Sequence, residues 1–118
     1  MTTVVPPTDG VHIRQAERAD LLAVLRIEQE SFPQPWPLQA LEHHLDEPGF
    51  LVAQDGVVVG YVVAATVPNH GRPLGHIKDL AVRAERRGEG IGSRLVERAV
   101  GVLDSLGARS VKLEVRES

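Results

Sequence analysis

The sequence predicts a single domain of the mixed α/β class, built on one sheet with helices on its flanks. Strand and helix patterns follow one another along the chain, and 118 residues are enough for one hydrophobic core only. At the centre of this pattern, a strand at residues 75–82 leads through a glycine-rich turn at residues 86–93 into an amphipathic helix. The hydrophobic content of 42% is sufficient for a core and argues against disorder.

The first half of the chain predicts one strand and two helices. Residues 1–9 are interpreted as a loose lead-in, and residues 11–16 alternate between apolar and polar side chains, as in a half-buried strand. Asp20 is placed to cap a first helix, which is expected to end near Ser31. A second helix is expected over residues 38–46, after a proline in its first turn.

The connector between these helices, residues 32–37, contains three prolines and the single tryptophan of the chain. The prolines exclude a helix interior and hold the segment extended. Two interpretations stay open. The aromatic side chains form a hydrophobic lid over the core, or Phe32, Pro33 and Trp36 form a rim that binds a peptide at low entropic cost.

The second half of the chain predicts the rest of the sheet. Strands at residues 50–54 and 57–67 are joined by a tight turn, and a loop then leads into the central strand. The pattern of residues 108–116 predicts a last strand after the helix. In that strand the polar pair Lys112 and Glu114 lies opposite the apolar positions.

The glycine-rich turn predicts an anion site. The glycines in residues 88–92 let the backbone approach a ligand, and free N–H groups at the start of a helix suit a phosphate. A Walker loop would need a Lys-Ser/Thr pair where this chain has Ser93-Arg94, so that motif is excluded. A dinucleotide motif stays open with Glu114 as its acid, although residues 83–86 separate its first glycine from the strand.

The composition excludes several other classes of protein. A net charge of −3 gives no general attraction to nucleic acid or to an acidic membrane, and without cysteine there is neither a thiolate metal site nor a cysteine nucleophile. His43 and His44 are adjacent, so they do not share a helix face as a metal-binding pair would, and no metal is expected. No apolar run is long enough to span a membrane and the first residues lack the order of a signal peptide, which predicts a cytoplasmic protein.

A third motif also fits the turn. Residues 87–92 read Arg-Gly-Glu-Gly-Ile-Gly and meet the pattern Arg/Gln-x-x-Gly-x-Gly/Ala, after a strand that ends Leu-Ala-Val at residues 80–82. This combination resembles the pyrophosphate loop of the GCN5-related N-acetyltransferases (GNAT), and the order of elements resembles the N-terminal part of their fold. The Phe-Pro-x-Pro-Trp run at residues 32–36, the Gly-His-Ile start of the central strand and the Leu-Glu-Val-Arg run at residues 113–116 resemble the RimI type. That type comprises the ribosomal-protein-alanine N-acetyltransferases and their archaeal protein N-terminal relatives.

The resemblance implies acetyl-CoA as the co-substrate and the free α-amine of a protein N-terminus, such as that of a ribosomal protein, as the acceptor. In the family, the backbone of the central strand orients the pantetheine arm of the co-substrate, and the N–H groups of the turn hold its pyrophosphate. Carried over residue by residue, the implied cofactor-binding positions are Leu80, Ala81, Val82, Arg87, Gly88, Glu89, Gly90, Ile91, Gly92 and Ser93.

The resemblance also implies two catalytic side chains. Glu114 matches the general base of the family, which takes a proton from the substrate ammonium, and partial burial on the inner face of the sheet is expected to raise its pKa toward neutrality. A surface pair with Lys112 or Arg116 is the alternative. His76, on the neighbouring strand, is a second candidate for the proton relay because an imidazole titrates near neutrality, with a bond to a backbone carbonyl as its alternative.

In the family, the Leu-Glu-Val-Arg run is followed by an asparagine that contacts the cofactor. A helix comes next, which carries the tyrosine that acts as general acid and protonates the leaving thiolate, and two strands end the fold. We therefore expect a GNAT fold that lacks its last helix and strands, with an open strand edge through which a homodimer could form. Tyr61 lies in an earlier strand and is not expected to replace the missing acid. Three alternatives stay open: a small-amine acetyltransferase, an acetyl-CoA-binding domain with little activity, and a dinucleotide-binding module.

Overall fold

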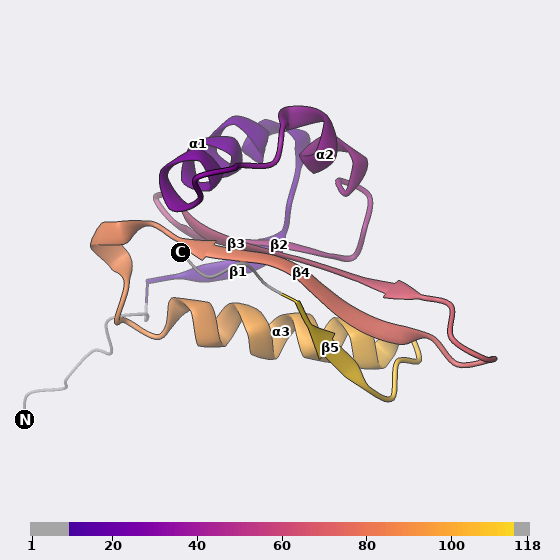
Figure 1. Ribbon diagram of the computed structural model, residues 1–118. Helices are drawn as coiled ribbons and strands as arrows, with labels where there is room; N and C mark the ends of the chain where they lie inside the picture. Colours follow the sequence, from indigo (N-terminus) through magenta and orange to yellow (C-terminus); the bar gives the residue numbers. More distant parts are fainter. Residues whose placement is uncertain (1–9, 115–118) are drawn as a thin grey trace, which may run out of the picture.

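The computed structural model describes residues 10–114, and its elements form three layers (Figure 1). A sheet lies in the middle, with α1 (Leu21–Ser31) and α2 (Leu38–His43) on one face and α3 (Ile91–Ser105) on the other. Between residues 10 and 114, no helix is both long and apolar enough to cross a membrane.

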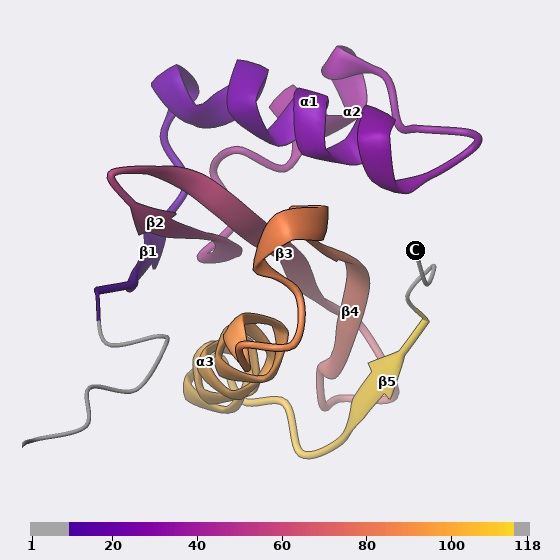
Figure 2. The ribbon, with the colours of Figure 1, turned by 90° about the vertical axis from the view of Figure 1, so that its left-hand side faces the viewer.

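The five strands of the sheet lie side by side in the order in which they occur along the chain. Their bounds are β1 (His12–Gln15), β2 (Gly49–Asp55), β3 (Val57–Val67), β4 (Leu74–Val82) and β5 (Val111–Leu113). The first four pair antiparallel, and β5 pairs parallel to β4 after the crossover through α3 (Figure 2). Two short 3₁₀ helices, η1 (Arg18–Asp20) and η2 (Ala84–Arg86), precede α1 and α3.

Each face of the sheet has its own hydrophobic core, because the strands present apolar side chains to both helical layers. The core on the α3 side includes Leu51, Val62, Ile77, Ile91, Leu95, Ala99 and Leu103. The core on the α1 and α2 side includes Leu21, Val24, Ile27, Phe32, Leu41, Phe50, Val52 and Tyr61. The central strands are therefore buried on both faces, and a ligand can reach the sheet only at its edges.

A β-bulge in β4 decides which residues of that strand face each layer. Val63 pairs with Asp79 and Ala64 pairs with Ile77, so Lys78 is an extra residue without a partner in β3. Ile77 belongs to the core on the α3 side, whereas Asp79 contacts Tyr61 in the core on the other side. The bulge thus exchanges the two faces of β4 just before the predicted cofactor-binding residues 80–82.

Most of the expected elements are confirmed, with three differences. The second helix ends at His43, before the expected residue 46. The last strand is restricted to Val111–Leu113 and all its side chains are exposed, because it pairs only with β4; residues 115–118, like the lead-in at residues 1–9, lie outside the described residues. Asp20 makes no side-chain cap on α1, because its carboxylate is bound instead by Arg14 at 2.8 Å and by the N–H of Glu17 at 2.7 Å.

Candidate active site

The glycine-rich turn forms an open backbone cradle at the start of α3. Gly88 and Gly90 have φ angles of +82° and +85°, in the left-handed region that a side chain disfavours. A Cβ atom at either position would meet no atom within 4 Å, so the space over the turn is empty of protein. The first N–H groups of a helix have no partner within the helix, so the start of α3 beside this space is suited to an anion.

Arginine side chains hold the cradle in place. The Arg86 side chain binds Glu89 at 3.0 Å and Asp55 at 3.1 Å, which ties the turn to the β2–β3 hairpin. Arg87 donates through Nε to the carbonyl of Val82 at 3.1 Å, which closes the end of β4. Arg87 and Glu89, both predicted to bind the cofactor, are thus already engaged with protein groups, and their expected contribution is to shape the turn.

A depression with a volume of about 490 Å³ lies next to the cradle, between β4 and the first turns of α3. It is lined by Leu80 of β4 and by Gly92, Ser93, Val96 and Glu97 of α3. Three of the predicted cofactor-binding residues therefore lie around one open space. A larger depression of about 700 Å³ is lined by consecutive residues 66–73, at the end of β3 and in the loop that leads to β4. It is therefore the inner side of one turn and does not lie between separate elements.

Within residues 10–114, no strand pairs with the outer edge of β4 beyond Ile77, so in the described part of the chain this edge is open beside the depression. β5 pairs only with Gly75, His76 and Ile77, and the N–H of Glu114 adds one bond to the carbonyl of Ile77 at 3.1 Å. The β5 strand ends at Leu113, whereas β4 continues to Val82. The N–H of Leu80, on the open part of the strand, donates to the side chain of Asp79 at 3.2 Å.

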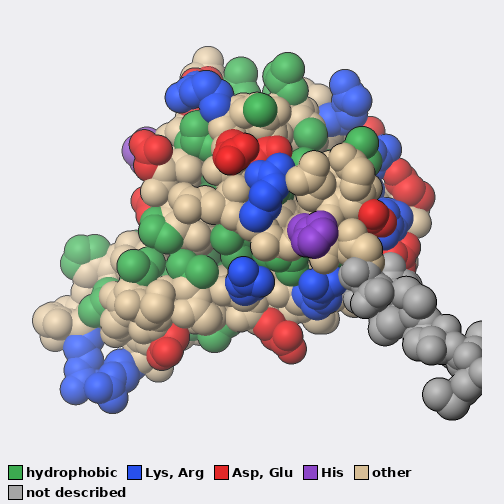
Figure 3. Space-filling view, turned by 180° about the vertical axis from the view of Figure 1, so that it is seen from behind, with side chains coloured by type: hydrophobic (Ala, Val, Ile, Leu, Met, Phe, Trp, Pro, Cys, Tyr) green, Lys and Arg blue, Asp and Glu red, His purple; other side chains and the backbone are tan. Residues whose placement is uncertain are grey.

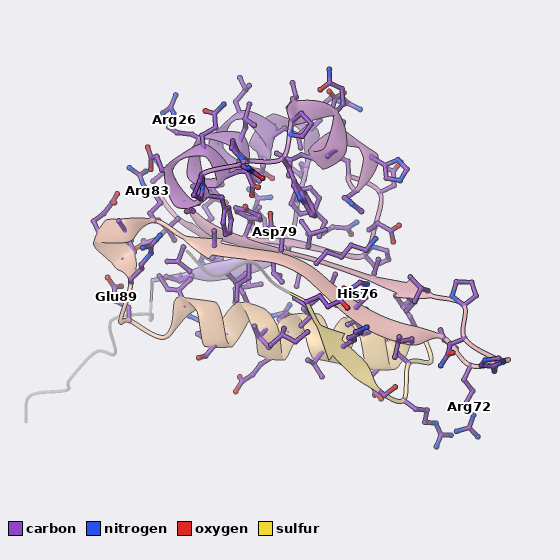
Figure 4. All side chains as sticks on the ribbon, in the orientation of Figure 1. Arg26, Arg72, His76, Asp79, Arg83 and Glu89 are labelled. Atoms are coloured by element: carbon purple, nitrogen blue, oxygen red, sulfur yellow. The ribbon has the colours of Figure 1, made fainter. Side chains whose placement is uncertain are left out.

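The two predicted catalytic side chains, His76 on β4 and Glu114 just after β5, lie together. His76 Nε2 lies 3.0 Å from one carboxylate oxygen of Glu114, and Lys112 Nζ lies 2.7 Å from the other. His76 is largely buried, and Figure 4 shows it beside β5. The side chain of Glu114 is 50% exposed. The expected bond from His76 to a backbone carbonyl is thus replaced by a bond to the predicted base.

The expected rise in the pKa of Glu114 is wrong. The hydrogen bond from Lys112, the charge of that ammonium and the hydrogen bond from His76 hold the pKa of this carboxyl below its usual value. The reason is structural: β5 is short and lies at an edge, so no layer formed by residues 10–114 covers Glu114, and burial contributes little. Glu114 is accordingly a carboxylate at neutral pH, and the same bond raises the pKa of Lys112.

The structure divides the aromatic connector between the core and the surface. Phe32 is 5% exposed and packs in the core beneath α1 and α2, which matches the lid interpretation for that residue. Pro33 is exposed, and Trp36 is half-buried and stacks on His44 with ring centroids 5.6 Å apart. Burial, with Lys78 and His43, lowers the pKa of His44, which keeps its imidazole neutral. Of the three predicted rim residues, Pro33 and Trp36 are therefore accessible to an incoming ligand, and Phe32 is not.

Sequence reasoning missed a buried polar cluster under this connector. Glu28, Tyr61 and Asp79 are all fully buried, and the Tyr61 hydroxyl bonds to both carboxyl groups. Figure 4 shows Asp79 between the sheet and the helical layer of α1. A signal was present in the sequence: a carboxyl on the apolar face of α1, a tyrosine in an apolar strand, and an acid next to the Leu-Ala-Val run.

The surface carries charges of both signs. Basic and acidic side chains are interspersed on the face shown in Figure 3. Among residues 10–114, no group of three or more His, Cys, Asp and Glu side chains has a geometry that could hold a metal ion.

The mixed sheet with helices on both faces matches the fold of N-acetyltransferases. The sequence profile of the Acetyltransferase (GNAT) family matches residues 21–118, and the chain belongs to this family. Its class of activity is therefore transfer of an acetyl group from acetyl-CoA to an amine nitrogen.

Similar proteins carry the names of N-acetyltransferases. The chain is 30% identical over 110 residues to a putative [ribosomal protein bS18]-alanine N-acetyltransferase of Bacillus subtilis, covering 90% of this chain and 70% of the relative. It is 33% identical over 117 residues to an N-alpha-acetyltransferase of Sulfolobus acidocaldarius, covering 88% and 69%. The crystal structure of Ard1 from Thermoplasma volcanium superposes with a TM-score of 0.80 at 28% identity, covering 91% of this chain and 72% of that one.

Proposed function

We propose that this N-acetyltransferase acts on the free α-amine of a protein N-terminus, such as that of a ribosomal protein. The observation that carries the proposal is the arrangement along β4. The cradle and depression lie at one end of its open edge, and the His76–Glu114 pair lies where β5 leaves that edge. The names of the relatives support a protein N-terminus as the acceptor.

The donor side would be formed by backbone groups. N–H groups of residues 88–93 would hold the pyrophosphate of acetyl-CoA, since the space above them is open and the helix start favours an anion. The open edge at residues 80–82 would pair with the pantetheine arm and orient the thioester. Acetyl-CoA supplies the activated acetyl group in this arrangement.

The acceptor side would be formed by side chains. An α-ammonium group must lose a proton before its nitrogen can form the new amide bond as the C–S bond of the thioester breaks. Glu114 is a carboxylate at neutral pH and would accept that proton, with His76 positioned at 3.0 Å to pass it on. Pro33 and Trp36 would form the rim that holds the first residues of the peptide.

The test is an acetyl-transfer assay on matched peptides, read by mass spectrometry. Each peptide is offered with a free N-terminus and with a blocked N-terminus, and both forms contain an internal lysine. We expect acetylation only at the free α-amine, and much slower transfer with Glu114→Gln. Acetylation of the lysine in the blocked peptide, or of a polyamine or aminoglycoside in preference to any peptide, would refute the proposed acceptor. A lack of transfer despite acetyl-CoA binding would identify an acetyl-CoA-binding domain.

A further inference from the structure

A continuous chain of hydrogen bonds runs between the sheet and the α1–α2 layer, beneath the proposed site. The N–H of Trp36 donates to one oxygen of Glu28 at 2.9 Å, and the other oxygen of Glu28 bonds to the Tyr61 hydroxyl. The same hydroxyl contacts one oxygen of Asp79 at 3.1 Å, and the other oxygen of Asp79 accepts the N–H of Leu80 at 3.2 Å. The chain thus begins in the connector between α1 and α2 and ends on the open edge of β4.

The three side chains of this network are inaccessible to solvent. Glu28, Tyr61 and Asp79 each have a relative exposure of 0%. Buried carboxyl groups are costly unless they are hydrogen-bonded, so each contact in the network constrains the others. Burial and the two neighbouring carboxyl groups raise the pKa of Tyr61 well above its ordinary value, which keeps the phenol protonated at any working pH.

The phenol of Tyr61 lies between two carboxyl groups. Tyr61 has a single O–H but lies against two carboxyl groups, so it can donate to only one of them at a time. The second contact is a hydrogen bond only when the other carboxyl is protonated and donates to the phenol oxygen. Glu28 and Asp79 are therefore linked through Tyr61, and a change in the bonding of one alters the bonding of the other.

The two ends of the network coincide with the two sides of the proposed reaction. Leu80 lines the depression on the donor side, and its N–H lies on the open edge of β4. Trp36 is a half-buried ring at the acceptor rim, fixed by its backbone bond to Glu28 and by stacking on His44.

We propose that Glu28, Tyr61 and Asp79 form a positioning network that couples the Leu80 amide on the donor side to Trp36 on the acceptor side. The inference rests on the proposed function for the roles of the two ends. When a bound thioester group takes the N–H of Leu80, Asp79 loses that donor and its carboxyl turns to Tyr61. The hydroxyl shifts between the two carboxyl groups, and the contact of Glu28 with the Trp36 backbone changes with it. Donor binding thereby adjusts the acceptor rim.

Trp36 is the only tryptophan of the chain, so its fluorescence reports directly on this rim. Acetyl-CoA is titrated into the protein, and binding is measured independently by the rise in melting temperature. We expect the Trp36 emission of the wild type to change with the same midpoint as binding. Tyr61→Phe removes the linking hydroxyl, and we expect it to retain the thermal shift and to lose most of the emission change. An emission change of wild-type size in Tyr61→Phe, or no change in the wild type while acetyl-CoA binds, would overturn the coupling.

A second set of variants tests the acceptor end without any ligand. Glu28→Leu removes the acceptor of the Trp36 N–H at similar volume, and we expect a red-shifted emission that is more readily quenched by acrylamide. Glu28→Gln keeps a carbonyl for Trp36 and an amide for Tyr61, and we expect wild-type emission. Glu30→Leu makes the same exchange at an exposed position of the same helix and is the matched control. A wild-type spectrum for a folded Glu28→Leu would overturn the positioning role of Glu28.

The two proposals fail in different ways. If the wild type does not bind acetyl-CoA, the donor side of the proposed function and the coupling both fall, while the ligand-free spectra still decide whether Glu28 positions Trp36. If transfer to peptides is observed, we expect Tyr61→Phe and Glu28→Leu to raise the KM for the peptide several-fold and to leave the KM for acetyl-CoA nearly unchanged. A fall in kcat alone would contradict a positioning role.

Discussion

Replacing Gly90 by alanine tests the role of the cradle separately from the stability of the rest of the fold. Gly90 has a φ of +85°, and a Cβ there meets no protein atom within 4 Å, so the cost of the substitution is conformational and not steric. A left-handed residue other than glycine costs about 1–2 kcal/mol. Gly101, inside the same helix, also has open space around its Cβ position, and alanine there gains about 1 kcal/mol in helix propensity. The two variants are therefore expected to differ by about 2–3 kcal/mol.

The assay is thermal unfolding of both variants with and without acetyl-CoA. A change of 1 kcal/mol corresponds to about 4 °C for a domain of this size, so the melting temperatures should differ by about 10 °C. Acetyl-CoA at about 100 times its dissociation constant adds about 2.7 kcal/mol to a protein that binds it. We expect that gain in the wild type and in Gly101→Ala and a much smaller one in Gly90→Ala, whose methyl group projects into the cradle. Equal protection of both variants would refute the assignment of the turn as the anion site.

Two further predictions concern charged side chains. Lys112→Ala removes the main cause of the lowered pKa of Glu114, so we expect the acid limb of the pH profile of kcat/KM to move to higher pH; an unmoved limb would exclude Glu114 as the titrating base. Arg14 lowers the pKa of Asp20, so this pair stabilises the fold above the ordinary carboxyl pKa of about 4 and the gain is lost as pH falls through the lower folded value. Urea unfolding should show Asp20→Asn less stable than the wild type at neutral pH, with the difference closing in acid; a constant difference would contradict the linkage.

Much of the fold could be predicted because local pattern and tertiary structure agree. The β3 strand was predicted with its observed bounds, and α1 ends at Ser31 as expected, since it has a clear apolar face and a proline shortly after its end. The last strand begins later than predicted, at Val111. The alternation in residues 108–116 indicates that the segment can form a strand, but it does not indicate where a neighbouring strand is available to pair with it. With β4 as its only partner, pairing stops at Leu113.

The candidate site was predictable in its backbone part and less so in its side chains. Turn geometry follows from local residue types, and Gly88 and Gly90 have the expected left-handed angles. The pKa of Glu114 depends on Lys112 and His76, one of them on another strand, and on the absence of a covering layer among the described residues. The bulge at Lys78, which turns Asp79 toward Tyr61, arises from pairing with β3 and leaves no periodic signal.

The agreement between strand order and chain order bears on how the protein forms. Neighbouring strands β2, β3 and β4 are linked by short turns, so their pairing closes only small loops, and topologies dominated by such near-sequence pairings fold fast. During synthesis from the N-terminus, the four antiparallel strands and the α1–α2 layer are complete before α3 is made. The glycine-rich turn and α3 are therefore added to four strands whose other face is already covered.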